Sequence, residues 1–288
     1  MQNVMVWVIN DDFRGDHWRY AGNLDKVFSY LKLQVENSLN LGWKKEDIII
    51  ITNFDFSYMG VNAYKIDTDI CKWSSFANKL TCVNKMIKFG VIKEDFWLHD
   101  TDAFQLLPFE FPSDCKDWGY TRHDPRRDKP QGGSGFFRKS GFDIVDKIAS
   151  LILITKVKRE EKFLPLFFKE KGENRTKKLE ESILSLSSNT KNASKIKTLK
   201  EELECGRDAY GKFGNRFSFL NYTYDLCMAR YFSIKYPKTE LPVKVIHFHP
   251  EYESCSDCFI LGKNRLNTKV TTLELDNLLE KYNLYKKE

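Results

Sequence analysis

Long apolar runs are missing from this sequence. No stretch reaches the roughly 18 consecutive apolar residues that a membrane-spanning helix needs. The opening residues, MQNVMVWVIN, also lack the basic start and the long apolar block of a signal peptide. We therefore expect a soluble, cytoplasmic protein.

The sequence also lacks a clear set of paired cysteines and a large excess of charge of one sign. The seven cysteines are an odd number and lie between residues 71 and 258. Because the chain shows no secretory signal, we expect small buried thiols instead of a disulfide framework. The net charge of +6 suits an anionic ligand, but it is far weaker than that of a dedicated nucleic-acid-binding domain. What the chain does have is 42% hydrophobic residues in a length of 288, enough for a sizeable core.

Strand and helix patterns alternate along the first hundred residues. Apolar, β-branched runs at 4–9, 47–53 and 95–98 predict buried strands. Apolar residues recur at helical spacing over 24–39 and 76–89, and each of these segments stops close to a glycine. Strand, helix and strand in about 50 residues make a βαβ unit, so we expect an α/β fold with parallel strands.

Polar residues follow the predicted strands at the point where each strand ends. The first strand runs into Asn10 and Asp11, the second ends at Asn53, and the third continues into Asp100 and Asp102 within FWLHDTDAFQL. Ligands of open α/β sheets bind beyond the carboxyl ends of the strands, so these side chains predict one shared crevice.

The carboxylates of Asp100 and Asp102 are the centre of that prediction. Two like charges close together cost free energy unless a cation neutralises them, and Mn²⁺ and Mg²⁺ prefer oxygen ligands. If the segment stays extended, the i, i+2 spacing places both side chains on one side, where a single ion can bind. The alternative is a solvated turn in which Asp102 caps the following segment.

The second half of the chain changes character. The turn-rich HDPRRDKPQGGSG (residues 123–135) predicts a mobile loop over the crevice. Residues 156–206 are rich in Lys and Glu and predict a helical insertion made of two amphipathic helices joined near residue 188. The other predicted elements are a strand at 136–137, a helix at 222–231, a strand at 243–247 and a terminal helix at 273–282.

These motifs resemble the GT-A nucleotide-sugar glycosyltransferases, most closely in layout the glycogenin-like retaining branch. The resemblance covers roughly the first 140 residues and resumes at residues 245–248. It rests on the first strand, the helix with Asn78-Lys79-Leu80, the triplet Asp100-Thr101-Asp102, the segment Gly132-Gly133-Ser134-Gly135-Phe136-Phe137, and Val245-Ile246-His247-Phe248. It implies one GT-A domain over 1–288, with 156–206 as an insertion.

The resemblance also implies the ligands of the site. Asp100, Asp102 and His247 would hold a Mn²⁺ or Mg²⁺ ion that bridges the diphosphate of a UDP- or GDP-sugar. The residues it places around the donor are Asn10 and Asp11 near the nucleoside, Lys79 near the phosphates or the sugar, and Gly133 and Ser134 close to the donor or acceptor. Metal and lysine would together neutralise the charge that develops on the leaving nucleoside diphosphate.

The sequence departs from this family in two places. The segment G-x-x-K-P-W does not follow His247, and no D-Q-D triplet follows the S-G strand. The carboxylates that could serve as a base are Asp124, Asp208 and Asp225, the last on the predicted helix 222–231. An inverting enzyme needs such a base and a retaining one does not, so the stereochemistry stays open.

The acceptor and two other kinds of protein also stay open. A saccharide or another hydroxyl is the expected acceptor, and a modified DNA base, with phosphate contacts from Arg122, Arg126 and Arg127, is a second possibility. His247, His249, Cys255 and Cys258 could instead form a structural zinc site in a non-catalytic nucleotide- or nucleic-acid-binding module. A nucleotidyltransferase could use the same carboxylates, but no glycine-rich basic phosphate loop follows the first strand.

Overall fold

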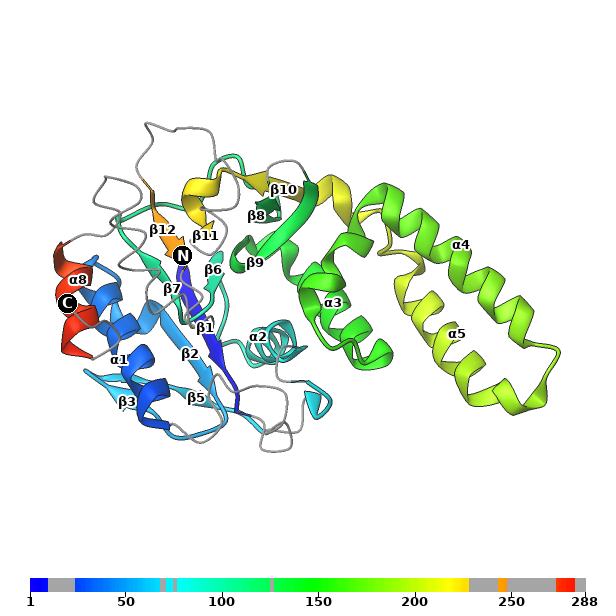
Figure 1. Ribbon diagram of the computed structural model, residues 1–288, viewed down its shortest axis with the longest axis horizontal. Helices are drawn as coiled ribbons and strands as arrows, with labels where there is room; N and C mark the ends of the chain where they lie inside the picture. Colours follow the sequence, from blue (N-terminus) through cyan, green and yellow to red (C-terminus); the bar gives the residue numbers. More distant parts are fainter. Residues whose placement is uncertain are drawn as a thin grey trace.

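A seven-stranded mixed sheet lies at the centre of the molecule, in the order β10-β8-β9-β6-β1-β2-β5 (Figure 1). The computed structural model describes residues 1–9, 24–67, 71–74, 77–124, 127–227, 243–247 and 273–282. β1 (Gln2–Trp7) lies between β2 (Ile48–Thr52) and β6 (Phe96–His99), and both neighbours run parallel to it. β5 (Tyr64–Lys65) extends the parallel half beside β2. The predicted α/β class is confirmed, and the carboxyl ends of β1, β2 and β6 share one edge.

The other half of the sheet reverses direction. β9 (Arg127–Phe137) pairs antiparallel with β6 and with β8 (Trp118–Asp124), and β10 (Phe217–Leu220) lies parallel to β8. The prediction of a mobile loop was therefore wrong for 123–124 and 127–135, which are strand. Residues 125 and 126 lie outside the described residues. Glycine and proline are turn signals in a short window, but here strand partners on both sides of β9 hold the segment extended.

Two smaller sheets complete the strands. β7 (Ala103–Gln105) pairs antiparallel with β12 (Val245–His247), and β11 (Leu226–Cys227) lies parallel to β12 on its other side. β3 (Ser57–Tyr58) and β4 (Val61–Asn62) form a short hairpin. The strand predicted at 243–247 is confirmed as β12. The predicted helix at 222–231 was wrong over its described part, which is a 3₁₀ turn at Tyr222–Tyr224 followed by β11.

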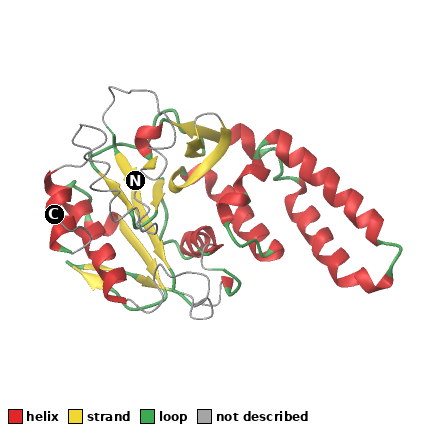
Figure 2. Cartoon of the chain, viewed as in Figure 1, coloured by secondary structure: helices red, strands yellow, loops and turns green. Residues whose placement is uncertain are grey.

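Helices cover both faces of the main sheet (Figure 2). α1 (Leu24–Asn40) and α8 (Leu273–Lys281) pack together on one face, and α2 (Lys79–Lys88) and α3 (Phe142–Thr155) on the other. Each helix except α3 follows a helical pattern predicted from the sequence. The 3₁₀ turns lie at Lys45–Asp47, Lys139–Gly141, Glu160–Lys162, Leu164–Phe167, Thr190–Asn192 and Phe213–Arg216.

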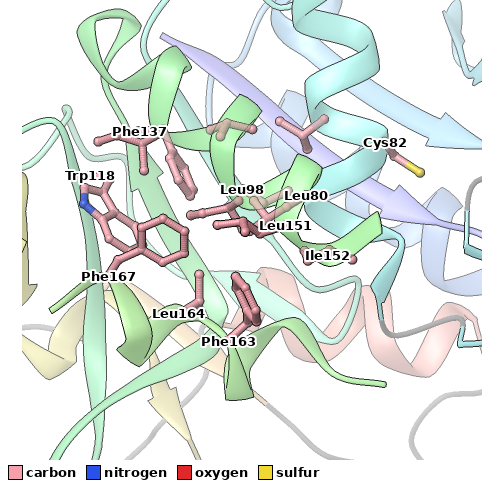
Figure 3. Close-up of a cluster of buried hydrophobic side chains, with 14 of the residues drawn as sticks. Leu80, Cys82, Leu98, Trp118, Phe137, Leu151, Ile152, Phe163, Leu164 and Phe167 are labelled. Carbon is pink, nitrogen blue, oxygen red and sulfur yellow. The ribbon is translucent and has the colours of Figure 1, made fainter. Parts of the chain in front are cut away.

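The two faces bury separate apolar clusters. The cluster under α2 and α3 includes Trp118, Phe137 and Phe167 (Figure 3), and the one under α1 and α8 includes Leu31 and Phe104. Cys71, Cys82, Cys115 and Cys205 form no disulfide, and the first three are buried as expected. Burial raises the pKa of the Cys71 thiol to about 11, which is the behaviour of an inert core thiol. None of the helices in the described part of the chain has the length and apolar composition needed to cross a membrane.

α4 (Lys169–Leu186) and α5 (Ala193–Arg207) form a helical hairpin that projects from the α3 side of the molecule (Figure 1). These are the two helices predicted within 156–206. Inside the hairpin, the buried carboxylate of Glu202 accepts hydrogen bonds from Arg175 Nη2 at 2.6 Å and from the Tyr210 hydroxyl at 2.8 Å. Desolvation, with the neighbouring Glu202, raises the pKa of Tyr210, so its hydroxyl stays a donor.

We expect Glu202→Ala to lower the free energy of unfolding by about 1–3 kcal/mol, because it leaves the Tyr210 hydroxyl and Arg175 without their acceptor. Urea denaturation measures the loss, and hydrogen exchange should locate it in α4 and α5. Glu181→Ala is the matched control, since Glu181 pairs with Lys177 at 4.0 Å on the exposed surface of the same hairpin. That change should stay within about 0.5 kcal/mol, and equal effects of the two variants would contradict the assignment.

Candidate metal centre

Asp100 and Asp102 lie in a tight turn directly after β6. The backbone N–H of Ala103 donates to the carbonyl of Asp100 at 3.0 Å, and the N–H of Asp100 donates to the carbonyl of Gly133 on β9 at 2.8 Å. The segment is therefore a turn, which is the alternative to the extended form considered from the sequence. The turn still directs both carboxylates to one place, because the chain reverses between β6 and β7 around Thr101.

A buried amide on α1 holds this turn from behind. Gln34 Nε2 donates to the carbonyls of Thr101 at 2.7 Å and Ala103 at 2.9 Å, and Asn37 on the next turn of α1 donates to the carbonyl of Gln105 at 2.9 Å. Neither residue was predicted from the sequence as part of the site. Polar residues at 34 and 37 inside an otherwise apolar helix face were the available signal, since a buried amide needs partners.

His247, at the end of β12, completes the group. Its Nε2 lies 3.2 Å from Asp102 Oδ1 and 3.7 Å from Asp100 Oδ2. One ligand atom from each of Asp100, Asp102 and His247 lies within 4.8 Å of the others. Asp102 and His247 are buried, whereas the Asp100 side chain is 33% exposed. A group of two carboxylates and one imidazole, with Asp100 partly exposed, fits a divalent cation.

The charges around His247 are unusually concentrated. Burial by itself lowers the pKa of His247, but the carboxylates of Asp102 and Asp225 outweigh it and raise the pKa well above the ordinary value. The two carboxylates thus favour a positive charge at the position of the imidazole. His99, by contrast, is buried without a carboxylate partner, and burial lowers its pKa to about 3. It is a neutral ring that contacts Asn3 Oδ1 at 2.7 Å.

Asp225 lies on the other edge of the His247 ring. Its Oδ1 is 3.2 Å from His247 Nδ1, and Gln131 Nε2 on β9 is 3.5 Å from the same nitrogen. Asp225 follows the 3₁₀ turn at Tyr222–Tyr224, so the helix expected around it is not formed. Burial raises the pKa of Asp225, and His247 opposes that rise.

Gly133 makes room for the ring. A Cβ at this position would lie 2.0 Å from His247 Nδ1 and 3.1 Å from Asp225 Oδ2. Any side chain would therefore displace the imidazole. The glycine was predicted to let backbone approach the donor or the acceptor, whereas the close approach that the structure contains is to His247.

Lys79 reaches the group from the start of α2. Its Nζ lies 2.5 Å from Asp100 Oδ1 and donates to the carbonyl of Gly132 at 2.8 Å. The lysine thus joins the exposed side of the carboxylate pair, opposite the buried His247. The structure brings six of the predicted site residues together: Lys79, Asp100, Asp102, Gly133, Asp225 and His247.

Other predicted site residues lie elsewhere. The Ser134 hydroxyl is buried and accepts a hydrogen bond from the Trp97 indole at 2.7 Å. Asp124 is at the end of β8, opposite Arg127, and its side chain is outside what the structure describes. Asp208 is exposed and pairs with Lys212 at 3.1 Å. Arg122 is exposed and lies over the Phe219 ring. The positions outside the described residues are Asn10, Asp11, Arg126, His249, Cys255 and Cys258.

The zinc alternative depends on three of those undescribed residues, so it stays untested. His247 itself, however, already has a carboxylate at each ring nitrogen. A zinc site with His249, Cys255 and Cys258 would have to displace one of them.

Comparisons with known proteins find likeness in fold only. No protein-family model matches the chain, and a comparison with curated proteins finds no match. Solved structures that resemble it include a glycosyltransferase involved in glycosylation of the major capsid of PBCV-1 (9% identity, 86% of this chain and 92% of that one, TM-score 0.43). The galactosyltransferase LgtC, solved with donor and acceptor sugar analogs, gives 10% identity, 97% and 100% coverage and a TM-score of 0.44.

The glycosyltransferase GlyE of Streptococcus pneumoniae TIGR4 has 11% identity and a TM-score of 0.48, with 99% of this chain covering 61% of GlyE. The structural neighbours of the chain are thus glycosyltransferases, as the resemblance to the GT-A group led us to expect. With TM-scores below 0.5, the likeness carries no argument about activity.

We expect Gly133→Ala to weaken Mn²⁺ binding at least about tenfold and to lower the free energy of unfolding by about 1–3 kcal/mol, because the new methyl group overlaps the His247 ring. Isothermal titration with Mn²⁺ and thermal unfolding measure the two effects. Ser134→Ala, on the same strand, should cost about 1 kcal/mol for its lost hydrogen bond and leave Mn²⁺ affinity unchanged. Wild-type Mn²⁺ affinity in Gly133→Ala would contradict the close packing.

Proposed function

We propose that this protein is a metal-dependent glycosyltransferase that transfers a sugar from a nucleoside-diphosphate sugar to a hydroxyl acceptor. One observation carries the proposal: Asp100, Asp102 and His247 converge, beside Lys79, where β6 ends. His247 follows Asp102 by 145 residues (247 − 102) in the chain, and local sequence alone gives no reason for the two to meet. The carboxyl edge of parallel strands is also where α/β folds bind their ligands.

The donor atoms fit Mn²⁺ or Mg²⁺. Asp100 and Asp102 supply carboxylate oxygens, which suit both ions, and His247 supplies an imidazole nitrogen, which favours a transition metal. When bound, the ion neutralises charge on the diphosphate of the donor and stabilises it as a leaving group. The chain's own part is to hold the carboxylates at one point and to leave the Asp100 side open to that diphosphate.

Lys79 is proposed to bind the diphosphate or the sugar from the same open side. In the structure its ammonium group neutralises Asp100 at 2.5 Å. A divalent ion at Asp100 would take over that neutralisation, and the lysine would then be available for the donor. Two cationic groups at one leaving group are the arrangement that stabilises developing negative charge most directly.

The rest of the donor and acceptor sites is proposed from the sequence. Asn10 and Asp11 would contact the nucleoside of a UDP- or GDP-sugar, because they follow β1 in the sequence and the carboxyl end of β1 shares an edge with that of β6, which precedes Asp100. A saccharide is the proposed acceptor. Asp124 stands as the candidate base should the reaction invert, since Asp225 is buried behind His247. We propose one domain over residues 1–288 with the 156–206 segment as a helical insertion.

We expect a UDP- or GDP-sugar to raise the melting temperature only when Mn²⁺ is present, since binding at 100 times the dissociation constant adds about 2.7 kcal/mol. Asp102→Ala should abolish this Mn²⁺-dependent stabilisation. A thermal-shift screen of sugar nucleotides with and without Mn²⁺ provides the measurement, and Asp208→Ala, at an exposed carboxylate, is the control that should behave as wild type. The proposal fails if no sugar nucleotide stabilises the wild-type protein.

We expect Lys79→Met to weaken binding of the stabilising sugar nucleotide about tenfold or more while Mn²⁺ still binds, because the change removes a cation from the donor and none of the metal ligands. Isothermal titration of each ligand separates the two affinities. Lys88→Met is a matched control, since Lys88 pairs with Asp146 on the exposed end of the same helix. Equal nucleotide affinity in Lys79→Met and wild type would remove Lys79 from the donor site.

A further inference from the structure

Asp225 is a buried carboxylate that the proposed donor and metal sites do not use. Its side chain has no exposed surface, and its Oδ2 is buried without a hydrogen-bond partner among the described residues. A general base has to reach the proton that it removes. The His247 ring separates Asp225 from the exposed side of the cluster. Asp225 is therefore poorly placed to act as a base, and another role fits its position better.

The two edges of the His247 ring face different groups. Nε2 faces Asp102 at 3.2 Å and Asp100 at 3.7 Å, whereas Nδ1 faces Asp225 at 3.2 Å. The group of atoms close enough to share one ion contains Asp100, Asp102 and His247 but not Asp225. Asp225 therefore contacts a metal ligand from behind, on the side away from the ion.

The backbone around Asp225 is fixed to the strand that carries His247. Asn221 caps the 3₁₀ turn through its side chain, which accepts from the N–H of Thr223 at 3.0 Å. The N–H of Lys244 donates to the carbonyl of Thr223 at 2.8 Å. In the parallel pair of β11 and β12, Cys227 is opposite His247. This arrangement gives the carboxylate a set position against the ring.

A neutral imidazole carries its single proton on one nitrogen, and only the other nitrogen can bind a metal. We propose that Asp225 is a positioning residue: it accepts a hydrogen bond from Nδ1–H of His247 and so leaves Nε2 to coordinate the ion beside Asp100 and Asp102. Histidine ligands in metal sites commonly have such an outer carboxylate, whose loss weakens metal binding about 10–100-fold. The inference rests on the proposed metal-dependent function, because it needs an ion at Nε2.

Gly133 supports the same geometry from β9, because its missing Cβ opens the space in which Nδ1 meets Asp225. Gln131 Nε2 lies 3.5 Å from the same nitrogen, and since an amide nitrogen can only donate, it competes with Asp225 for Nδ1. Asp225 Oδ1 is the closer group, at 3.2 Å, and it is the one that can accept a proton from Nδ1. The carboxylate thus sets which nitrogen of His247 faces the ion.

A double-mutant cycle tests this role. Isothermal titration with Mn²⁺ alone is applied to the wild type, Asp225→Ala, His247→Ala and the double variant. We expect Asp225→Ala to weaken Mn²⁺ binding about 10–100-fold. In the His247→Ala background the same change should alter affinity by less than about twofold, because Asp225 acts only through the ring. Additive losses would make Asp225 an independent contributor and overturn the inference.

Two further variants guard against a simple folding defect. Asp225→Asn keeps the shape and one carbonyl acceptor, so it should lose less Mn²⁺ affinity than Asp225→Ala. Asp117→Asn disturbs a carboxylate bonded to Arg216 at 2.5 Å elsewhere in the molecule, and it should leave Mn²⁺ binding unchanged. Nitrogen-15 chemical shifts of the His247 ring, recorded with the diamagnetic ion Mg²⁺ bound, should report a proton on Nδ1 and a coordinated Nε2 in the wild type, and a change at both nitrogens in Asp225→Ala.

The outcomes separate the two proposals. A wild-type protein that binds no Mn²⁺ would overturn the proposed function and this inference with it. Wild-type binding that is unchanged in Asp225→Ala, with an unchanged ring tautomer, would overturn the role of Asp225 alone and leave the proposed function standing.

Discussion

The repulsion between carboxylates packed around one imidazole is the constraint on which the site depends. Asp100, Asp102 and Asp225 all approach His247, and two of the three are buried with it. Negative charges in such a place are stable only with cations at hand. The structure supplies Lys79 on the exposed side, and a divalent ion held by Asp100, Asp102 and His247 would supply the rest. The surrounding architecture holds these charges together.

That architecture draws on elements distant in the sequence. The turn that carries Asp100 and Asp102 connects β6, in the large sheet, to β7, in the small one, so the carboxylates lie where the two sheets meet. β12 pairs with β7 and delivers His247 to the same junction. Gln34 on α1 holds the turn from one side, and Gly133 on β9 leaves the space for the ring on the other. Each of these contacts joins groups that are close in space, and most join residues that are far apart in the sequence.

The helical hairpin projects away from the strands that carry the site (Figure 1). α4 and α5 extend from the α3 side, and they are held by their own buried contacts between Arg175, Glu202 and Tyr210 (Figure 1). The cluster at Asp100 lies by contrast beside the apolar core under α1, which includes Phe104 from β7. Changes in the hairpin and changes in the metal centre should therefore act on stability and on binding separately.

The sequence by itself determined the βαβ opening, the strand before Asp100 and the identity of three metal-ligand candidates. Periodicity reports burial directly, and a carboxylate pair at a strand end is visible without a structure. Only the tertiary structure decided that 123–135 is largely strand and that Asp225 lies outside a helix against His247. Those outcomes depend on partners far along the chain: β6 and β8 for the glycine-rich strand, and β12 for Asp225. A local residue pattern cannot report the free energy of pairing with a distant strand, and that free energy decided both outcomes.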